Sequence, residues 1–378
     1  MSRTTTRASA SAVLLPALTG FLVVRMLVLV AVLRLRPADA DTPQGLLDPL
    51  LSADDGVIGR VAAQGYGGVV RTVDGGAFSD TAVWPLQPAL VRLVGVLTGA
   101  EPSAASLEEL SLAVSVTASF AAAAVLCLMV RATYGNRAAV ATTWLWAALP
   151  VGASLWTSGP YAVLAALSFG SLLAWSAGRP VLAGALAGAA ALTDPVGVAA
   201  SAALVTGAVA ALARGRMARA SGAWALTLAA TPPVAYAAWL ADRRGSVDAV
   251  VTVLRSRAET EGGVRLLREQ VSALLDSPAV VLVAALVAAL AVGLVLSVAD
   301  RQPVELAVHA AVALLLLGLT APGLAAAGAL SLVVVGAWMP LGDVIAARSR
   351  TQQALILTTL LVIALAWTSS GLPGSPWA

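Results

Sequence analysis

The sequence has very few charged residues for its length. Only 11% of its 378 residues are charged, whereas 59% are hydrophobic, and the mean hydropathy is +0.88. No soluble domain of this size could keep such a balance in solution. The composition therefore excludes a soluble protein and predicts that lipid is the main solvent of the chain.

Lysine is absent, so all 23 basic residues are arginine, and the chain has one cysteine and one histidine. Cys127 lies within an apolar stretch, so a single chain can form neither a disulfide framework nor a cysteine metal site. No basic cluster is interleaved with aromatic residues, which excludes nucleic acid as a partner. His309 also lies on an apolar stretch, where we expect it to hydrogen-bond a neighbouring helix rather than bind a ligand.

What the chain has in abundance is long apolar runs. A transmembrane helix needs about 20 mostly apolar residues. Such stretches occur at 13–33, 110–130, 138–157, 161–178, 195–213, 222–240, 279–299, 304–319, 322–340 and 352–369. The apolar piece 181–192 is too short to cross alone, and we expect it to form a hairpin with 195–213. The runs predict an all-α polytopic membrane protein with about ten spans in one domain, residues 1–378.

The positions of the arginines predict the orientation of these spans. Arg3 and Arg7 are expected to hold the N-terminus in the cytoplasm, and the first stretch is then an uncleaved span. The short loops that follow carry arginines on the same side: Arg131, Arg137, Arg179, Arg214, Arg216, Arg219, Arg301, Arg348 and Arg350. Two long segments, 34–109 and 242–278, then lie on the extracytoplasmic side of the cell membrane.

Within the first outer segment, residues 53–66 read as a short helix with an acidic start and a glycine-containing stop. Asp54 and Asp55 suit the start of a helix, because the helix dipole favours negative charge at its N-terminus. One interpretation is that they cap this helix. The other is that one carboxylate acts as a general base or a metal ligand.

Residues 82–93 of the same segment contain a tryptophan and two prolines before an amphipathic run. Trp84 suits a membrane interface, and proline suits the start of a helix. The pattern predicts a helix that lies against the bilayer.

Taken in order, four segments resemble motifs of the PIG-V-like mannosyltransferases, members of the GT-C glycosyltransferase superfamily. Asp54 to Gly56 with residues 61–66 resemble W-D-G-x-W-Y-x-x-I-A-x-x-G-Y, and residues 83–92 resemble F-F-P-L-Y-P-x-L-x-R. Residues 150–164 resemble P-x-x-x-x-x-S-x-x-Y-x-E-S-L, and residues 192–197 resemble L-T-R-P-x-G. The resemblance implies a GT-C-like bundle of roughly ten to twelve transmembrane helices with a long extracytoplasmic first loop.

The resemblance also implies an activity: transfer of a mannosyl or other hexosyl group from a polyprenyl-phosphate sugar donor to a lipid or glycan acceptor on the extracytoplasmic face. Asp55 matches the family's acid before glycine and is the candidate base, with Asp54 as its substitute. The implied substrate-binding residues are Arg60, Tyr66, Trp84, Gln87, Arg92, Tyr161 and Asp194. Arginine suits the leaving phosphate, because its planar guanidinium makes two parallel hydrogen bonds. Looser phosphate candidates are Arg243, Arg244, Arg255 and Arg257, and for each arginine an interfacial anchor or an ion pair is the alternative.

The sequence also departs from these motifs. The family's tryptophan is Asp54 here, its aromatic pair is Val57 and Ile58, and its hairpin arginine is Asp194. A first alternative is therefore a catalytically degenerate relative that acts as a subunit or scaffold in cell-envelope glycan assembly. For Asp194 itself, capping of a helix that starts at Pro195 is the alternative to substrate contact.

A second alternative, from a different class, is a membrane transporter. Transporters usually place charged groups near the middle of the membrane. Here the ionisable residues concentrate in loops, and only His309 and Glu305 lie in or at the edge of a late span. A divalent metal is left open, because Asp54, Asp55 and Asp74 have suitable oxygen ligands but no specific spacing.

Overall fold

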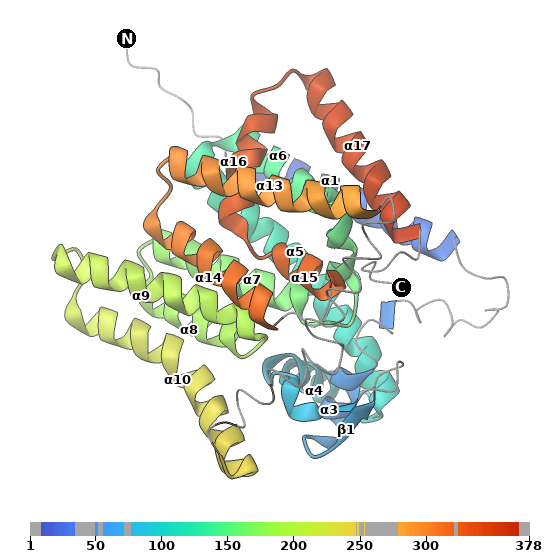
Figure 1. The fold of residues 1–378 in the computed structure, drawn as a ribbon, viewed down its shortest axis with the longest axis vertical. Coiled ribbons are helices and arrows are strands. Elements are labelled where there is room, and N and C mark those ends of the chain that lie inside the picture. Colours follow the sequence, from blue (N-terminus) through green and yellow to red (C-terminus); the bar gives the residue numbers. More distant parts are fainter. Residues whose placement is uncertain are drawn as a thin grey trace.

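The structure is a computed structural model that describes residues 9–34, 50–51, 56–71, 77–246, 248, 253, 279–320 and 324–369. Nearly all of this part is helical (Figure 1). The α-helices are α1 (Ala10–Arg34), α3 (Val57–Gln64), α4 (Leu86–Thr98), α5 (Ala104–Tyr134), α6 (Asn136–Ala148), α7 (Tyr161–Ser176), α8 (Pro180–Ala191), α9 (Val198–Ala213), α10 (Arg219–Arg244), α13 (Ala279–Ala299), α14 (Val304–Thr320), α15 (Leu324–Ser331), α16 (Val335–Ala346) and α17 (Arg350–Ser369). Short 3-10 helices are η2 (Asp80–Ala82), η3 (Pro150–Trp156) and η4 (Pro195–Gly197), and the strands are β1 (Val69–Arg71) and β2 (Ala77–Ser79).

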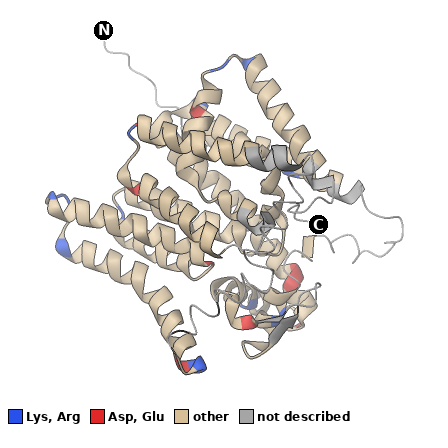
Figure 2. Cartoon of the chain, in the orientation of Figure 1, with Lys and Arg blue, Asp and Glu red and all other residues tan. Residues whose placement is uncertain are grey.

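The helices are those of an all-α polytopic membrane protein. In the described ranges, three are long and apolar enough to cross a membrane: Ala10–Ala31, Ala104–Tyr134 and Pro195–Ala213. Seven further apolar helices have 10–17 residues. Charged residues lie mostly at helix ends, while most helix shafts carry none (Figure 2). This separation suits an apolar layer bounded by water, because a charge inside a membrane is costly.

The helices follow the predicted apolar stretches, but two predicted spans are broken. The stretch 138–157 becomes α6 and η3, which bend by 83° at the break. Leu149 there is extended (φ −61°, ψ 138°), as expected for a residue before proline, and Pro150 has no N–H with which to continue the helix. The stretch 322–340 is likewise divided between α15 and α16. The predicted hairpin is present, with α8 and α9 joined through η4.

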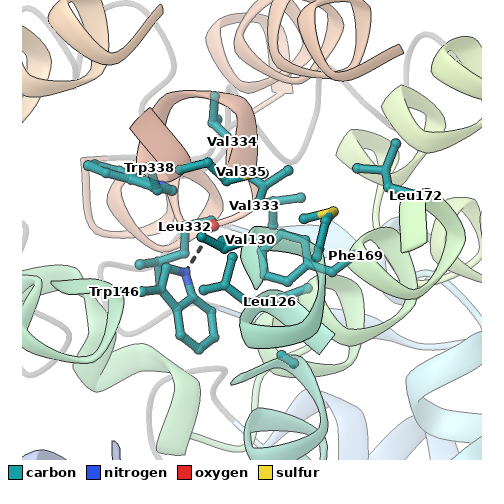
Figure 3. Packing of buried hydrophobic residues seen from close by; sticks show 14 of the residues in the cluster. Leu126, Val130, Trp146, Phe169, Leu172, Leu332, Val333, Val334, Val335 and Trp338 are labelled. Atoms are coloured by element: carbon teal, nitrogen blue, oxygen red, sulfur yellow. Dashed lines mark hydrogen bonds between the residues drawn. The ribbon is translucent and has the colours of Figure 1, made fainter. Parts of the chain in front are cut away.

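Small residues let the helix backbones approach closely. Gly184 and Gly188 of α8 lie against α10, where an added Cβ would meet the carbonyl oxygens of Ala225 and Leu228. Close backbone contact of this kind is how helices associate in lipid, where the hydrophobic effect is weak. Larger side chains fill the centre, and the Trp146 Nε1–H donates to the Leu332 carbonyl oxygen at 3.1 Å (Figure 3).

Arg25 is an exception to the expectation that ionisable residues concentrate in loops. It lies near the middle of α1 and is only 1% exposed. Its Nη2 donates to the carbonyl oxygen of Ala147, and its guanidinium carbon lies 5.7 Å from the Phe21 ring centroid. Ala147 is in the last turn of α6, so the guanidinium caps that helix beside its break from η3.

Residues 56–71 and 77–98, from the polar segment between α1 and α5, lie at one end of the bundle (Figure 1). We call these residues the first-loop body. It contains α3, α4, η2 and the antiparallel strands β1 and β2, which pair Val70 with Phe78. Its small apolar core includes Val57, Ile58, Val61, Val83 and Val91, and Leu107 and Leu240 from α5 and α10 complete it.

Candidate functional site

Helix α3 is fixed against α5 by a glycine contact and a carboxylate. The Gly59 N–H donates to the Oε2 atom of buried Glu108 at 2.6 Å. An added Cβ at Gly59 would meet the carbonyl oxygen of Ala104 and lie 2.8 Å from the Glu108 amide nitrogen. Only glycine allows this approach, so Gly59 lets the start of the first-loop body pack against the N-terminal end of α5.

The helix begins later than the sequence suggested. Gly56 is its N-cap, in the left-handed conformation (φ 64°), and Val57 is its first residue. Asp54 and Asp55, the two candidate bases, lie outside the described residues, so both catalytic assignments stay predictions. Arg60 is half-buried on α3, and its Nη2 is buried without a hydrogen-bond partner.

A carboxylate outside the motifs named above organises the turn after α3. Asp80 is 3% exposed, and its Oδ2 accepts the amides of Gly67 and Gly68 at 2.7 and 2.6 Å. Its Oδ1 is buried without a hydrogen-bond partner. The sequence feature that points to such an acceptor is the glycine-rich run that begins at Gly65, because a turn of this kind leaves backbone amides that need a hydrogen-bond acceptor.

The C-terminal part of α10 packs against this turn. Arg244 donates from Nη2 to the hydroxyls of Ser79 and Thr81, on either side of Asp80. Arg243 donates to the Tyr66 carbonyl oxygen at 2.8 Å. Proline within α10, at 232 and 233, disfavours a straight helix, and this end of α10 extends beyond α8 toward the first-loop body (Figure 1).

Four aromatic side chains join α10 to the first-loop body; we call them the aromatic cluster. The ring centroids of Trp84 and Tyr236 are 5.1 Å apart, those of Tyr236 and Trp239 are 5.5 Å apart, and those of Trp239 and Tyr66 are 5.3 Å apart. The cluster therefore brings together two predicted substrate-binding residues, Tyr66 and Trp84, with two that the sequence did not indicate.

The hydroxyls of the two tyrosines are used within the cluster. Tyr66 donates to the Val83 carbonyl oxygen at 2.9 Å, and Tyr236 donates to that of Thr81 at 2.7 Å. Burial raises the pKa of Tyr66 well above its ordinary value, and the neighbouring Tyr236 and Asp80 raise it further. Tyr66 is therefore a neutral hydrogen-bond donor throughout the physiological pH range.

Gln87 is buried, and its hydrogen bonds go to α5 rather than to the aromatic cluster. Its Nε2 donates to the hydroxyls of Ser111 and Ser115 at 3.1 and 3.3 Å, while its Oε1 is buried without a partner. Those serines donate in turn to the carbonyl oxygens of Ser158 and Gly159, at 2.6 and 2.9 Å. The amide thus holds α4 to α5 and to the segment that precedes Tyr161.

The remaining predicted residues have different settings. Asp194 is buried, and its Oδ1 accepts the Val196 amide at 2.9 Å, so the capping interpretation is confirmed. Tyr161 is half-buried at the start of α7. Arg92 is exposed on α4 and belongs to none of the clusters above. Arg255 and Arg257 lie outside the described residues, as does Asp74.

Metal binding was left open by the sequence. Within the part of the chain that the structure describes, no group of three or more histidine, cysteine, aspartate or glutamate side chains is placed to hold a metal ion. His309 is fully buried on α14, and neither of its ring nitrogens has a hydrogen-bond partner. The expectation that it hydrogen-bonds a neighbouring helix is therefore wrong.

Comparison with known proteins gives a match in structure only. No protein-family model matches the sequence, and no curated protein sequence matches it. The structure of ArnT from Cupriavidus metallidurans bound to undecaprenyl phosphate aligns with a TM-score of 0.54 at 17% identity, covering 97% of this chain and 68% of ArnT.

The apo oligosaccharyltransferase of Archaeoglobus fulgidus aligns with a TM-score of 0.52 at 16% identity, covering 94% of this chain. The chain spans only 56% of the length of that enzyme. At such low identities the likeness concerns the fold. The chain has the fold of the GT-C membrane glycosyltransferases.

Proposed function

We propose that the protein transfers a mannosyl or other hexosyl group from a polyprenyl-phosphate donor to a lipid or glycan acceptor at the outer face of the membrane. One observation carries the proposal: a GT-C bundle whose polar first-loop body is fixed at one end through Glu108 and Arg244. ArnT, which shares the fold, was crystallised with undecaprenyl phosphate. A lipid-linked donor is accordingly the class of substrate that suits this chain.

The proposed chemistry is an inverting displacement. The acceptor hydroxyl oxygen forms a bond to the anomeric carbon of the sugar, the bond from that carbon to the lipid phosphate breaks, and the phosphate leaves with the electron pair. Asp55 takes the hydroxyl proton, with Asp54 as the substitute. General-base assistance of this kind contributes about 10²- to 10⁴-fold to the rate.

The leaving phosphate needs positive charge. Arg60 lies on the first turn of α3, close in sequence to Asp55, and its buried Nη2 has no hydrogen-bond partner. A buried donor without a partner is costly, so a ligand oxygen at this position would stabilise the site. We therefore assign Arg60 to the phosphate ahead of Arg92, which is exposed on α4.

The degenerate relative is the second candidate, because the sequence departs from the mannosyltransferase motifs at Asp54, Val57 and Ile58. Buried Val57 and Ile58 belong to the apolar core of the first-loop body rather than to a polar surface. A scaffold would keep this fold without needing Asp55.

A transfer assay separates the two candidates. Purified wild type and an Asp55→Asn variant are incubated with radiolabelled polyprenyl-phosphate mannose and a lipid extract of the host. The enzyme predicts label in the acceptor with wild type and a loss of at least about 100-fold with the variant. Glu101→Gln, a change of an exposed carboxylate before α5, is the matched control and should transfer normally.

Transfer that persists in Asp55→Asn but disappears in Asp54→Asn would assign the role of general base to Asp54. No transfer by folded wild type from polyprenyl-phosphate mannose or polyprenyl-phosphate glucose would favour the scaffold.

A further inference from the structure

The two carboxylate oxygens of Asp80 have different surroundings. Its Oδ2 holds the turn amides of Gly67 and Gly68, whereas its Oδ1 is buried and accepts no hydrogen bond. Buried polar atoms are almost always paired, and leaving one unpaired costs about 1–3 kcal/mol or more for a charged group. A fold that only needed the turn capped could use a single acceptor. The free oxygen therefore suits a donor supplied by a ligand.

Arg244 adds donors beside this acceptor. Its Nη2 donates to the hydroxyls of Ser79 and Thr81, which flank Asp80 in the chain. A guanidinium has five N–H groups, and its side chain is exposed. The hydrogen bonds described for Arg244 use Nη2, so the N–H groups on its other nitrogens are available to a ligand. Acceptor and donors are thus presented at the same short helix, η2.

Trp84 supplies an apolar face next to them. It is half-buried, and its ring packs on Tyr236, whose hydroxyl donates to the Thr81 carbonyl oxygen. Aromatic side chains that are apolar on the face and polar at the edge suit ligands of mixed polarity. A pyranose ring has this character, with an apolar C–H face and a rim of hydroxyls that both donate and accept.

We propose that Asp80, Arg244 and Trp84 form a binding subsite for one hexopyranose unit. Asp80 Oδ1 accepts a hydrogen bond from one sugar hydroxyl, and Arg244 donates a hydrogen bond to the oxygen of a neighbouring hydroxyl. Trp84 packs against the C–H face of the sugar. The subsite rests on the proposed glycosyl transfer for its source of sugar, which is either the donor or the acceptor. It lies on the aromatic cluster that joins the first-loop body to α10.

A conservative substitution separates this role from a purely structural one. In Asp80→Asn the side-chain oxygen can still accept both glycine amides, while an NH₂ group replaces the unpaired oxygen. If Oδ1 serves only the fold, the change leaves sugar binding unaffected. If Oδ1 accepts a hydrogen bond from a sugar hydroxyl, the affinity for the sugar falls while the thermal unfolding temperature stays the same or rises.

The experiment measures binding of methyl α-D-mannopyranoside to the full chain in a detergent without sugar groups, by saturation-transfer NMR. We expect binding to wild type and a loss of about tenfold or more in affinity for Asp80→Asn and Arg244→Gln. Trp84→Leu should weaken binding and so reduce saturation transfer to the sugar C–H protons. Glu109→Gln and Trp224→Leu change an exposed carboxylate and a 62% exposed tryptophan, and both should bind as wild type does.

Competition identifies the source of the sugar. Displacement of the mannoside by polyprenyl-phosphate mannose assigns the subsite to the donor, and displacement by the host glycolipid fraction assigns it to the acceptor. Wild-type affinity in both Asp80→Asn and Arg244→Gln, or no saturation transfer from mannosides, glucosides and galactosides to wild type, would overturn the proposal. If Asp80→Asn does not fold, Arg244→Gln decides alone.

The outcome is independent of the transfer assay. Mannoside binding that depends on Asp80, without glycosyl transfer, would support the proposed subsite and contradict the proposed transfer activity. Transfer by wild type together with unchanged mannoside binding by the two variants would support the proposed transfer activity and contradict the proposed subsite.

Discussion

Arg25 has an unusual setting for a charged side chain. It is buried in the bundle and donates from Nη2 to the Ala147 carbonyl oxygen, but its Nε and Nη1 have no hydrogen-bond partner. Buried donors without partners destabilise a protein by about 1–3 kcal/mol. We predict that Arg25→Met raises the thermal unfolding temperature of the detergent-solubilised protein, whereas Arg25→Lys does not. A lower unfolding temperature for Arg25→Met would contradict this interpretation.

Tyr66 makes stability depend on pH in the alkaline range. Its pKa is raised above the ordinary value by burial first, then by Tyr236 and Asp80. Above about pH 10 the unfolded chain loses this proton while the folded chain keeps it. Ionisation then favours the unfolded state, so the contribution of Tyr66 to stability is complete below pH 10 and falls as the pH rises.

The matching variant is Tyr66→Phe. It should cost about 1 kcal/mol at neutral pH, because the bond to the Val83 carbonyl oxygen is lost. Urea titrations of both proteins from pH 8 to 11 should show that this difference shrinks above pH 10. A difference that is constant over this range would show that Tyr66 ionises equally in both states.

At the scale of elements, the contact between α3 and α5 should be sensitive to a single methyl group. Gly59→Ala places its Cβ against the Ala104 carbonyl oxygen, so α3 must move away from α5. We expect a loss of about 1–3 kcal/mol in stability and a parallel loss of glycosyl transfer. Thermal unfolding and the transfer assay measure the two effects.

Gly318→Ala on α14 is the matched control. No atom lies within 4 Å of an added Cβ at that position. Alanine in a helix interior should therefore stabilise the protein by roughly 0.5–1 kcal/mol. Equal effects of the two changes would contradict the assigned contact.

The positions of most helices could be predicted from the apolar runs, because lipid leaves the backbone few alternatives to a helix. The break at Leu149 and Pro150 could be foreseen only in part, since proline is also tolerated within membrane helices. The two short strands were not predicted. They depend on the amides of Gly67 and Gly68 finding Asp80, 12 residues or more downstream. No local pattern fixes that pairing.

For the site, the sequence indicated Tyr66, Trp84 and, as a looser phosphate candidate, Arg244, but not Tyr236 or Trp239. Arg244, Tyr236 and Trp239 lie on α10, more than 150 residues away, and only the packing of α10 on the first-loop body brings them near. Asp194 was predictable in its capping role, since capping is a local interaction with Val196.

At the scale of the whole molecule, the orientation in the membrane stays a prediction. With an N-terminus in the cytoplasm, Glu101 before α5 lies outside and Ala218 before α10 lies inside. The chain has one cysteine, Cys127, which is buried, so single-cysteine labelling is straightforward. On a Cys127→Ala background, a membrane-impermeant maleimide should label Glu101→Cys in intact cells and Ala218→Cys only after permeabilisation. The reverse pattern would invert the assignment of faces.

The central claim, glycosyl transfer from a lipid-linked donor, is tested most directly by mass balance in proteoliposomes. Purified protein is reconstituted with polyprenyl-phosphate [¹⁴C]mannose and the host lipid acceptor fraction. We predict that label lost from the donor equals label gained by an acceptor, with free polyprenyl phosphate released in equal amount. Label that remains on the donor, or that appears only as free mannose, with protein whose thermal transition shows it to be folded, would contradict the claim.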